Sequence, residues 1–139
     1  AKVYFNALFG KGFSRSDDCP VNAALNYGYS IILSIFNREV AASGYLTQLG
    51  LFHDNMFNQY NLSCDLMEPF RPFVDLTVRE MNPIKFDKEE KLQIYAMLSE
   101  EIRIDGRTQT FINAIKIYCK SIFAAIEEND ISLIRFACR

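Results

Sequence analysis

The sequence lacks most of what would mark a disordered, fibrous or membrane-spanning chain. Its 139 residues contain no Trp, one His, 4 Pro and 6 Gly, whereas half of the residues are hydrophobic. This composition excludes a flexible linker and a collagen-like repeat. No apolar run approaches the roughly 18–20 residues that a membrane span needs, because the best candidate, residues 29–36, is followed at once by Asn37, Arg38 and Glu39. We expect one globular domain with no membrane partner.

Charge and cysteine content point to no specialised class. Fifteen basic residues against seventeen acidic ones give a net charge of −2, so the chain lacks the overall basic excess of many nucleic-acid binders. Net charge does not exclude a local basic face. The four cysteines form no CxxC pair, which excludes zinc-finger spacing and argues against a secreted disulfide framework. With no signal peptide visible, reduced thiols in a cytoplasmic protein are the better interpretation.

Hydrophobic patterning predicts an all-α, multi-helix fold. Pro20 follows acidic residues and suits a first helical turn, Gly44 suits a C-terminal cap, and Asp87 with Glu90 has capping-box spacing. Asp105-Gly106 predicts a turn, and no useful stretch alternates with period two. The predicted elements in the first half are a helix over 20–43, a loop over 45–64 and an apolar helical stripe over 65–81 that Asn82-Pro83 ends. In the second half they are a helix from 87 through 102, a helix from 111 that ends at 127–129 and a short last helix over 131–137. The chain begins without Met inside a helical pattern, so 1–139 is expected to be a fragment.

One group of residues suggests metal chemistry. Asp65 and Glu68 have the i, i+3 spacing that shares one helix face, near a predicted N-terminus where the dipole favours carboxylates. Pro69 and Pro72 predict that this helix start is irregular, because Pro72 cannot donate to the Glu68 carbonyl. The only histidine, His53, lies in the preceding loop. Mixed imidazole and carboxylate ligands suit Mn²⁺ and tolerate Mg²⁺.

Each of these residues also has a plainer interpretation. A lone histidine beside Phe52 is commonly a partly buried, hydrogen-bonded residue. Asp65 is equally suited to be a helix N-cap, and Arg71 to be a surface ion-pair partner of Glu68. Periodicity and spacing alone therefore do not establish a site.

Three stretches together resemble one known family. They are Ala1-Lys-Val-Tyr-Phe-Asn-Ala-Leu-Phe-Gly10, then Pro20-Val-Asn-Ala-Ala-Leu-Asn-Tyr-Gly-Tyr29, and then His53 followed by Asp65-Leu-Met-Glu-Pro-Phe-Arg-Pro72. This combination is similar to the CRISPR-associated integrase family, the catalytic subunit of the spacer-acquisition complex, and most of all to members from type II systems. The resemblance covers essentially the whole chain and implies that 1–139 is the helical, metal-dependent C-terminal catalytic domain.

The resemblance also implies ligands and missing parts. The family holds a divalent metal, Mg²⁺ or Mn²⁺, with a Glu, a His and an acidic residue, and the last two match His53 and Glu68. Asp65 resembles a neighbouring acid that supports the metal site. The first Glu and the family's N-terminal β-domain are expected before Ala1, so this fragment alone is expected to be inactive. A non-catalytic helical module that contacts DNA or protein remains the alternative.

The implied reaction is a transesterification in CRISPR adaptation. The 3′-hydroxyl of a prespacer DNA end attacks a phosphodiester at the edge of a CRISPR repeat, with metal lowering the pKa of the hydroxyl. Partners implied are double-stranded DNA, a second copy of the full-length protein and the small subunit, CRISPR-associated protein two, in the prokaryotic cytoplasm. The residues expected to contact DNA are Arg15, Asn22, Tyr27 and Arg71.

Overall fold

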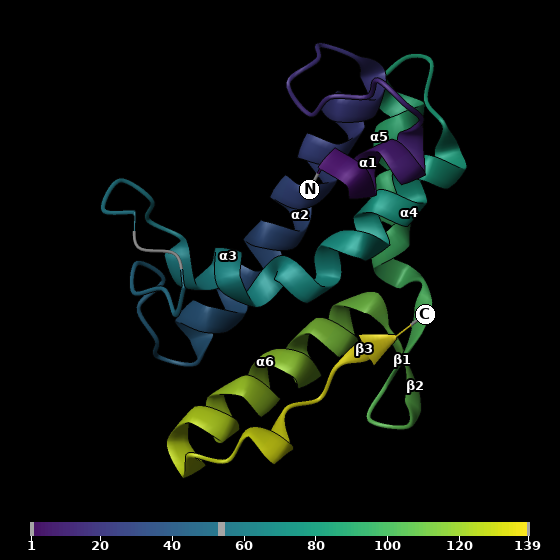
Figure 1. The fold of residues 1–139 in the computed structure, drawn as a ribbon. Coiled ribbons are helices and arrows are strands. Elements are labelled where there is room, and N and C mark those ends of the chain that lie inside the picture. Colours follow the sequence, from purple (N-terminus) through teal and green to yellow (C-terminus); the bar gives the residue numbers. More distant parts are fainter. Residues whose placement is uncertain (1, 53–54, 139) are drawn as a thin grey trace.

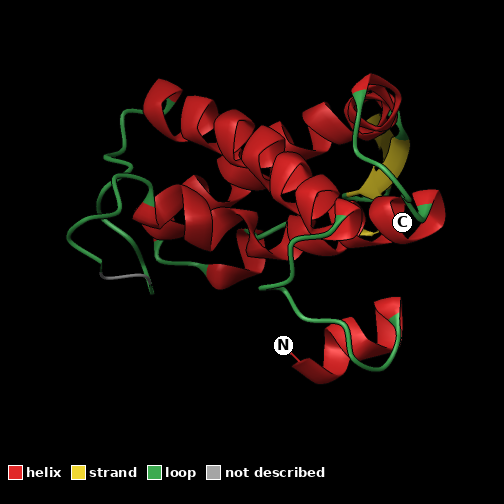
Figure 2. Ribbon diagram, turned by 90° about the horizontal axis from the view of Figure 1, so that it is seen from above, coloured by secondary structure: helices red, strands yellow, loops and turns green. Residues whose placement is uncertain are grey.

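The structure is a computed structural model that describes residues 2–52 and 55–138. It is mostly helical, as predicted, with one small sheet (Figures 1 and 2). In the part of the chain that the structure describes, no helix is long and apolar enough to cross a membrane. The helices are α1 Lys2–Phe9, α2 Pro20–Ala42, α3 Asn61–Met67, α4 Arg71–Met81, α5 Lys88–Ala96 and α6 Phe111–Glu128.

Helix α2 packs against most of the other helices, and its ends lie where the sequence predicts. Pro20 occupies the first turn after Cys19, whose backbone is extended. Gly44 follows the last turn with a φ of 81°, a left-handed conformation that glycine adopts without steric cost. The buried face of α2 contacts α3, α4, α5 and α6, so this helix sets the frame of the domain.

Helices α3 and α4 form one interrupted rod, joined by a 3-10 turn at Glu68–Phe70. The interruption confirms the predicted irregularity, since Pro69 and Pro72 both lack the N–H that a continuous helix would use. The expected start at Asp65 is wrong: α3 begins at Asn61. The Asn61 amide donates to the carbonyls of Gln48 and Asn55, at 3.1 and 3.0 Å, and these bonds fix the first turn against the preceding loop.

The chain after α5 is extended, and the predicted helix through 102 is wrong there. Helix α5 ends in a 3-10 turn at Met97–Ser99, and strands β1 Glu101–Ile104 and β2 Arg107–Thr110 form an antiparallel hairpin. Ile102 and Ile104 are buried while their neighbours in β1 are exposed, which is strand periodicity over four residues. The predicted turn at Asp105-Gly106 is correct, with φ values of 53° and 71°.

The C-terminal segment runs back beside α6 to the hairpin (Figure 1). The predicted helix over 131–137 is wrong, because only Ile131–Leu133 forms a 3-10 turn and Ala137–Cys138 forms strand β3. The Arg135 N–H donates to Ser121 Oγ of α6 at 3.0 Å, so the backbone bonds sideways instead of continuing a helix. Strand β3 pairs with β1, which gives the sheet order β2-β1-β3.

Aromatic side chains fill the centre where α2, α4 and α6 meet. The ring of Phe70, which is fully buried, lies 5.4 Å from Phe36, 5.6 Å from Phe111 and 5.3 Å from Tyr118. Helix α1 lies outside this core (Figure 2) and has no fully buried residue. Phe36, Phe70 and Phe111 are thus core residues, and the site is built on the surface that surrounds them.

Candidate carboxylate and arginine site

Asp65 ties the loop before His53 to helix α3. Its Oδ2 accepts hydrogen bonds from the backbone N–H groups of Leu51 and Phe52, both at 2.7 Å. Because Asp65 lies inside α3, whose N-cap position is Tyr60, the interpretation of Asp65 as a helix N-cap is wrong. A carboxylate that accepts two N–H bonds is well suited to fix a loop, since such charge-assisted bonds are short and strong.

Glu68 lies three residues after Asp65, at the start of the 3-10 turn. Its Oε1 accepts a hydrogen bond from Arg71 Nε at 2.8 Å, and half of its side-chain surface is exposed. The expected ion pair between Arg71 and Glu68 is therefore confirmed. Asp65 and Glu68 line one open hollow of about 490 Å³ together with Leu51 and Phe52. The structure brings these two predicted carboxylates together.

The described residues supply only part of a metal site. His53, the predicted imidazole ligand, lies outside the residues that the structure describes. Among residues 2–52 and 55–138, no group of three or more His, Cys, Asp or Glu side chains is arranged to hold a metal ion. The carboxylates of Asp65 and Glu68 are hard oxygen donors that suit Mg²⁺ or Mn²⁺. Their chemistry thus fits such an ion, and further ligands are needed to complete its shell.

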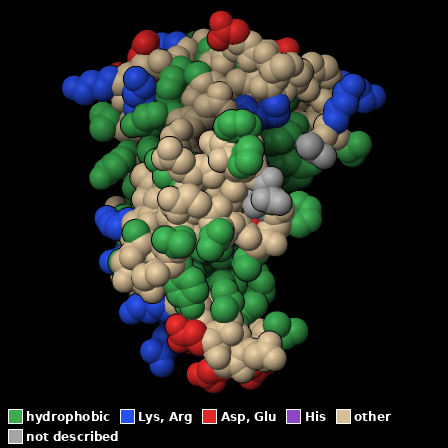
Figure 3. Space-filling view, turned by 90° about the vertical axis from the view of Figure 1, so that its left-hand side faces the viewer, with side chains coloured by type: hydrophobic (Ala, Val, Ile, Leu, Met, Phe, Trp, Pro, Cys, Tyr) green, Lys and Arg blue, Asp and Glu red, His purple; other side chains and the backbone are tan. Residues whose placement is uncertain are grey.

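Two side chains that line this hollow, Leu51 and Phe52, are apolar, and the same loop carries further exposed apolar residues. Phe52, Met56 and Phe57 are each nearly 90% exposed, and Leu51 is 67% exposed. Apolar side chains are prominent on the side of the molecule that Figure 3 presents.

Two arginines flank the ring of Tyr29, and one of them, Arg71, pairs with Glu68. The guanidinium carbon of Arg71 lies 4.7 Å from the centre of that ring, and the guanidinium carbon of Arg15 lies 5.5 Å from it. The predicted DNA contacts Arg15 and Arg71, far apart in sequence, are thus brought to one place. Arginine forks of this kind suit phosphate oxygens. Tyr29 itself was not among the predicted site residues.

Asn22 holds the loop that carries Arg15. Its side-chain amide donates to the carbonyls of Ser14 and Asp17, both at 2.8 Å, and its Oδ1 accepts a hydrogen bond from Arg15. Arg15 also donates to Asn26 Oδ1 at 2.6 Å. Asn22 is only 4% exposed. In this structure its side chain therefore orients Arg15 from a buried position.

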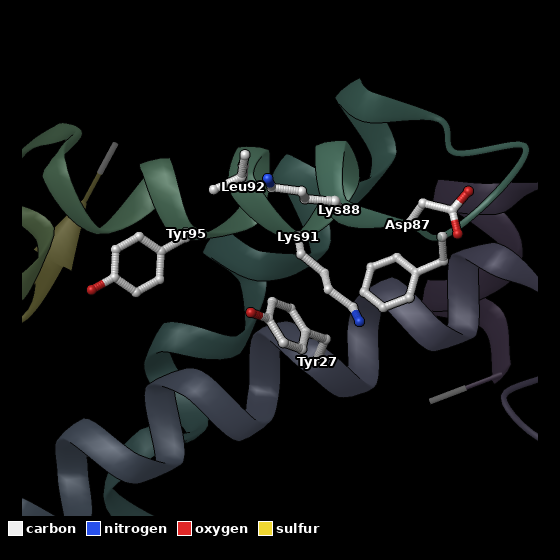
Figure 4. Close-up of a pocket in the computed structure, with 7 residues that line it drawn as sticks. Tyr27, Asp87, Lys88, Lys91, Leu92 and Tyr95 are labelled. Carbon is white, nitrogen blue, oxygen red and sulfur yellow. The ribbon is translucent and has the colours of Figure 1, made fainter.

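Tyr27, the remaining predicted DNA contact, lies apart from this group. Its ring meets that of Phe86 edge to face at 5.6 Å, and Lys91 Nζ lies 5.9 Å from the Tyr27 ring (Figure 4). Together with Tyr95 they line a hollow of about 550 Å³ between α2 and α5. Tyr27 and Tyr29 are two residues apart on a helix and therefore face different neighbours.

The hydroxyls of Tyr4 and Tyr29 both donate hydrogen bonds to Asp75, and both tyrosines stay protonated near neutral pH. Burial, together with the hydrogen bond to Asp75, raises the pKa of Tyr4 to about 12. The same causes raise the pKa of Tyr29 further, although the positive charges of Arg15 and Arg71 act in the opposite direction. Each tyrosine is thus a permanent hydroxyl donor.

These features define a helical domain with two carboxylates in one hollow and two arginines on one tyrosine ring, linked by the ion pair between Arg71 and Glu68. Comparisons with known proteins identify its family. The family model of CRISPR associated protein Cas1 matches residues 6–109. The chain therefore belongs to the Cas1 family, as the sequence motifs predict.

Individual relatives agree with this assignment. The chain is 49% identical over 78 residues to a CRISPR-associated endonuclease Cas1 of Neisseria meningitidis serogroup C, covering 56% of this chain and 26% of that protein. It is 38% identical over 110 residues to a CRISPR-associated endonuclease Cas1 of Pyrobaculum aerophilum, covering 73% of this chain and 36% of that protein. The chain thus spans about a quarter to a third of these relatives.

A solved structure has the same fold. A casposase bound to integration product superposes with a TM-score of 0.72 at 20% sequence identity, covering 91% of this chain and 46% of that one. This similarity independently supports the arrangement of the helices.

Proposed function

We propose that this chain is the helical catalytic part of a metal-dependent Cas1 endonuclease and integrase that acts in CRISPR adaptation. The reaction is a transesterification in which the 3′-hydroxyl of a prespacer DNA end attacks a phosphodiester of the CRISPR repeat, forms a new P–O bond, and displaces the 3′-oxygen of the cut strand as a free hydroxyl. One observation carries the proposal: Glu68 lies half-exposed in the hollow, with the Arg71 guanidinium on one carboxylate oxygen and Asp65 on the same wall. Family membership supports the same class of activity.

The proposed metal ligands are Glu68 and His53, with Mg²⁺ or Mn²⁺ as the ion and at least one further ligand from outside the described residues. The bound ion would lower the pKa of the attacking hydroxyl and stabilise negative charge on the phosphate. Asp65 contributes by holding the N–H groups of residues 51 and 52, which precede His53 in the chain. Asp65 thus supports the metal site by holding this loop. We further propose that its carboxylate also coordinates the ion.

The DNA contacts follow from the arginine pair. Arg15 and Arg71 present two guanidinium groups on the ring of Tyr29, and Arg71 also pairs with Glu68, so a phosphodiester bound by Arg71 would lie close to the proposed metal ligand. Asn22 contributes through its bond to Arg15. Tyr27 with Lys91 offers a second place for a DNA strand, because an aromatic ring and an ammonium suit a base and a phosphate.

The proposal includes the partners that such a reaction needs. They are double-stranded DNA, as prespacer and repeat, a second copy of the full-length protein and the small CRISPR-associated protein two. The casposase of similar fold is bound to integration product, which supports DNA as the ligand. A near-neutral domain suits an assembly whose DNA surface is shared among subunits. The proposed location is the prokaryotic cytoplasm.

The test is strand joining by the full-length protein with Glu68→Ala, His53→Ala and the control Glu128→Ala. Glu128 is exposed at the end of α6 and does not line the hollow. Loss of a metal ligand should lower the joining rate by at least ~100-fold, since such ions supply several kcal/mol. The joining rate of the Glu128→Ala control should stay within about twofold of the wild-type rate. Mn²⁺ binding, measured by calorimetry, should weaken in the first two variants only.

A non-catalytic interaction module is the alternative, since among the described residues the hollow is lined by only two carboxylates, those of Asp65 and Glu68. It predicts that full-length protein binds DNA and that Glu68→Ala changes neither joining nor Mn²⁺ binding. Unchanged joining by both His53→Ala and Glu68→Ala would refute the catalytic proposal.

A further inference from the structure

A carboxylate that is not part of the proposed metal site lies buried behind it. Asp75 of α4 is 2% exposed. It accepts a hydrogen bond from the hydroxyl of Tyr29 on α2 and another, at 2.7 Å, from the hydroxyl of Tyr4 on α1. A buried carboxylate is costly unless it is hydrogen-bonded. Both hydroxyls therefore stabilise it and join three helices at one point.

Tyr29 connects this buried carboxylate to the surface arginines. Its hydroxyl is held by Asp75, while its ring contacts the Arg71 guanidinium at 4.7 Å. Arg71 and Asp75 are four residues apart on α4 and so share a helix face. The ring is thus fixed at its far end, and the guanidinium above it has a rigid support. That same guanidinium donates to Glu68.

We propose that Asp75 is a positioning residue: through the Tyr29 hydroxyl it holds the aromatic ring that orients Arg71, and with it Arg15, toward the phosphate of bound DNA. The inference rests on the proposed function in one respect, that DNA binds at these arginines. It goes beyond that function because it names the group that fixes the orientation of the two arginines. An untethered tyrosine ring would tilt, and each guanidinium would sample more rotamers before meeting a phosphate.

Tyr4 provides a matched control within the same cluster. It donates the same kind of hydrogen bond to the same carboxylate, but its ring packs edge to face on Phe5 at 5.2 Å. Within the described residues, the rings that contact Arg15 are those of Phe5 and Tyr29, and the ring that contacts Arg71 is that of Tyr29. Tyr4→Phe and Tyr29→Phe thus remove equivalent bonds, and only the second acts on the arginines directly.

The experiment measures binding of labelled double-stranded DNA to the full-length protein without metal, at one fixed salt concentration because phosphate contacts are salt-dependent. Tyr29→Phe should raise Kd roughly fivefold to tenfold, as the loss of one bond to a charged group allows. Tyr4→Phe should change Kd by less than about twofold. Asp75→Asn perturbs both bonds and the core together, so the two Phe variants carry the test and thermal melting checks that each is folded.

A double-mutant cycle separates positioning from general destabilisation. If Tyr29 acts through Arg71, Tyr29→Phe should have almost no further effect on Kd in an Arg71→Ala background. Equal Kd changes for Tyr4→Phe and Tyr29→Phe, or a full Tyr29→Phe effect in that background, would overturn the inference. Wild-type protein that binds no DNA would overturn it too. Wild-type protein that shows the coupling but joins no DNA would refute only the proposed function.

Discussion

The backbone of Gly28 in α2 lies so close to Val74 in α4 that a Cβ atom on Gly28 would be 2.4 Å from Val74 Cγ1. Real Cβ atoms do not approach other heavy atoms this closely, and Ile94 of α5 is a further neighbour at 3.5 Å. Glycine therefore permits the close packing of α2 on α4. This packing brings Tyr29, the next residue, within hydrogen-bonding distance of Asp75.

Gly28→Ala should destabilise the domain. Overpacking a core costs about 1–3 kcal/mol, whereas the gain in helix propensity is only about 1 kcal/mol. The β-branched side chain of Val74 is fully buried and cannot rotate away freely. Urea unfolding should show a lower free energy of unfolding for Gly28→Ala, and the added substitution Val74→Ala should relieve the clash. A rise in stability for Gly28→Ala alone would contradict the packing.

Asp65→Ala should release the backbone at residues 51 and 52. Each N–H there donates to the Asp65 carboxylate, and a hydrogen bond to a charged group contributes about 1.5–3 kcal/mol. Hydrogen exchange measured by mass spectrometry should therefore speed up roughly tenfold or more at these amides. The Leu62 N–H, which donates to the Thr47 carbonyl, is an internal control and should keep its protection. Unchanged exchange at both residues would show that other bonds hold this loop.

Local signals predicted the ends of several helices because each depends on few residues. Pro20 and Gly44 bound α2, and Asp87 precedes α5 as the capping box requires, with its N–H donating to Glu90 at 2.8 Å. The irregular segment at 68–70 follows directly from the two prolines.

The small sheet was not predicted because its strands are too short for periodicity to reveal. Ile102 and Ile104 give only two buried positions, and Ile102 also continues the apolar spacing of α5. Strand β3 depends on pairing with a strand more than thirty residues earlier, which is tertiary information. The Asp105-Gly106 pair was the local signal for the hairpin of β1 and β2, since Asp-Gly is typical of a two-residue hairpin turn.

The candidate site was only partly accessible from the sequence. Asp65 and Glu68 share a helix face, so spacing alone brings them together. Arg15 and Arg71 meet only because α1, α2 and α4 converge. Tyr29 was missed because the motif Tyr-Gly-Tyr does not indicate which of its two rings faces the arginines. The seven-residue spacing from Asn22 to Tyr29, two turns along one helix face, is a signal that could have identified Tyr29.

Asp105→Ala should weaken the hairpin more than Asp105→Asn does. Asp105 adopts a φ of 53°, which Asn tolerates and Ala does not, and its carboxylate pairs with Arg135 Nε at 2.9 Å. Loss of the exposed ion pair, in either variant, should cost about 0.2–1 kcal/mol of stability. Forcing Ala into the left-handed conformation should cost about 1 kcal/mol more. Thermal melting should rank wild type above Asp105→Asn and Asp105→Asn above Asp105→Ala. Equal losses for both variants would mean that the conformation at this turn contributes nothing.

Alkaline pH should destabilise the domain partly through Cys119. Burial raises the pKa of this thiol from 9.0 to about 12, and Cys119 is 1% exposed. The unfolded thiol thus releases its proton at lower pH than the folded one, so this contribution to stability is complete below pH 9 and falls as pH rises toward 12. Between pH 8 and pH 10 the loss from this group should be about 1 kcal/mol. Urea unfolding under reducing conditions should show a smaller drop over that interval for Cys119→Ala. Cys138→Ala, which removes an exposed thiol, should retain the wild-type drop, and an equal drop in all three proteins would exclude Cys119 as a cause.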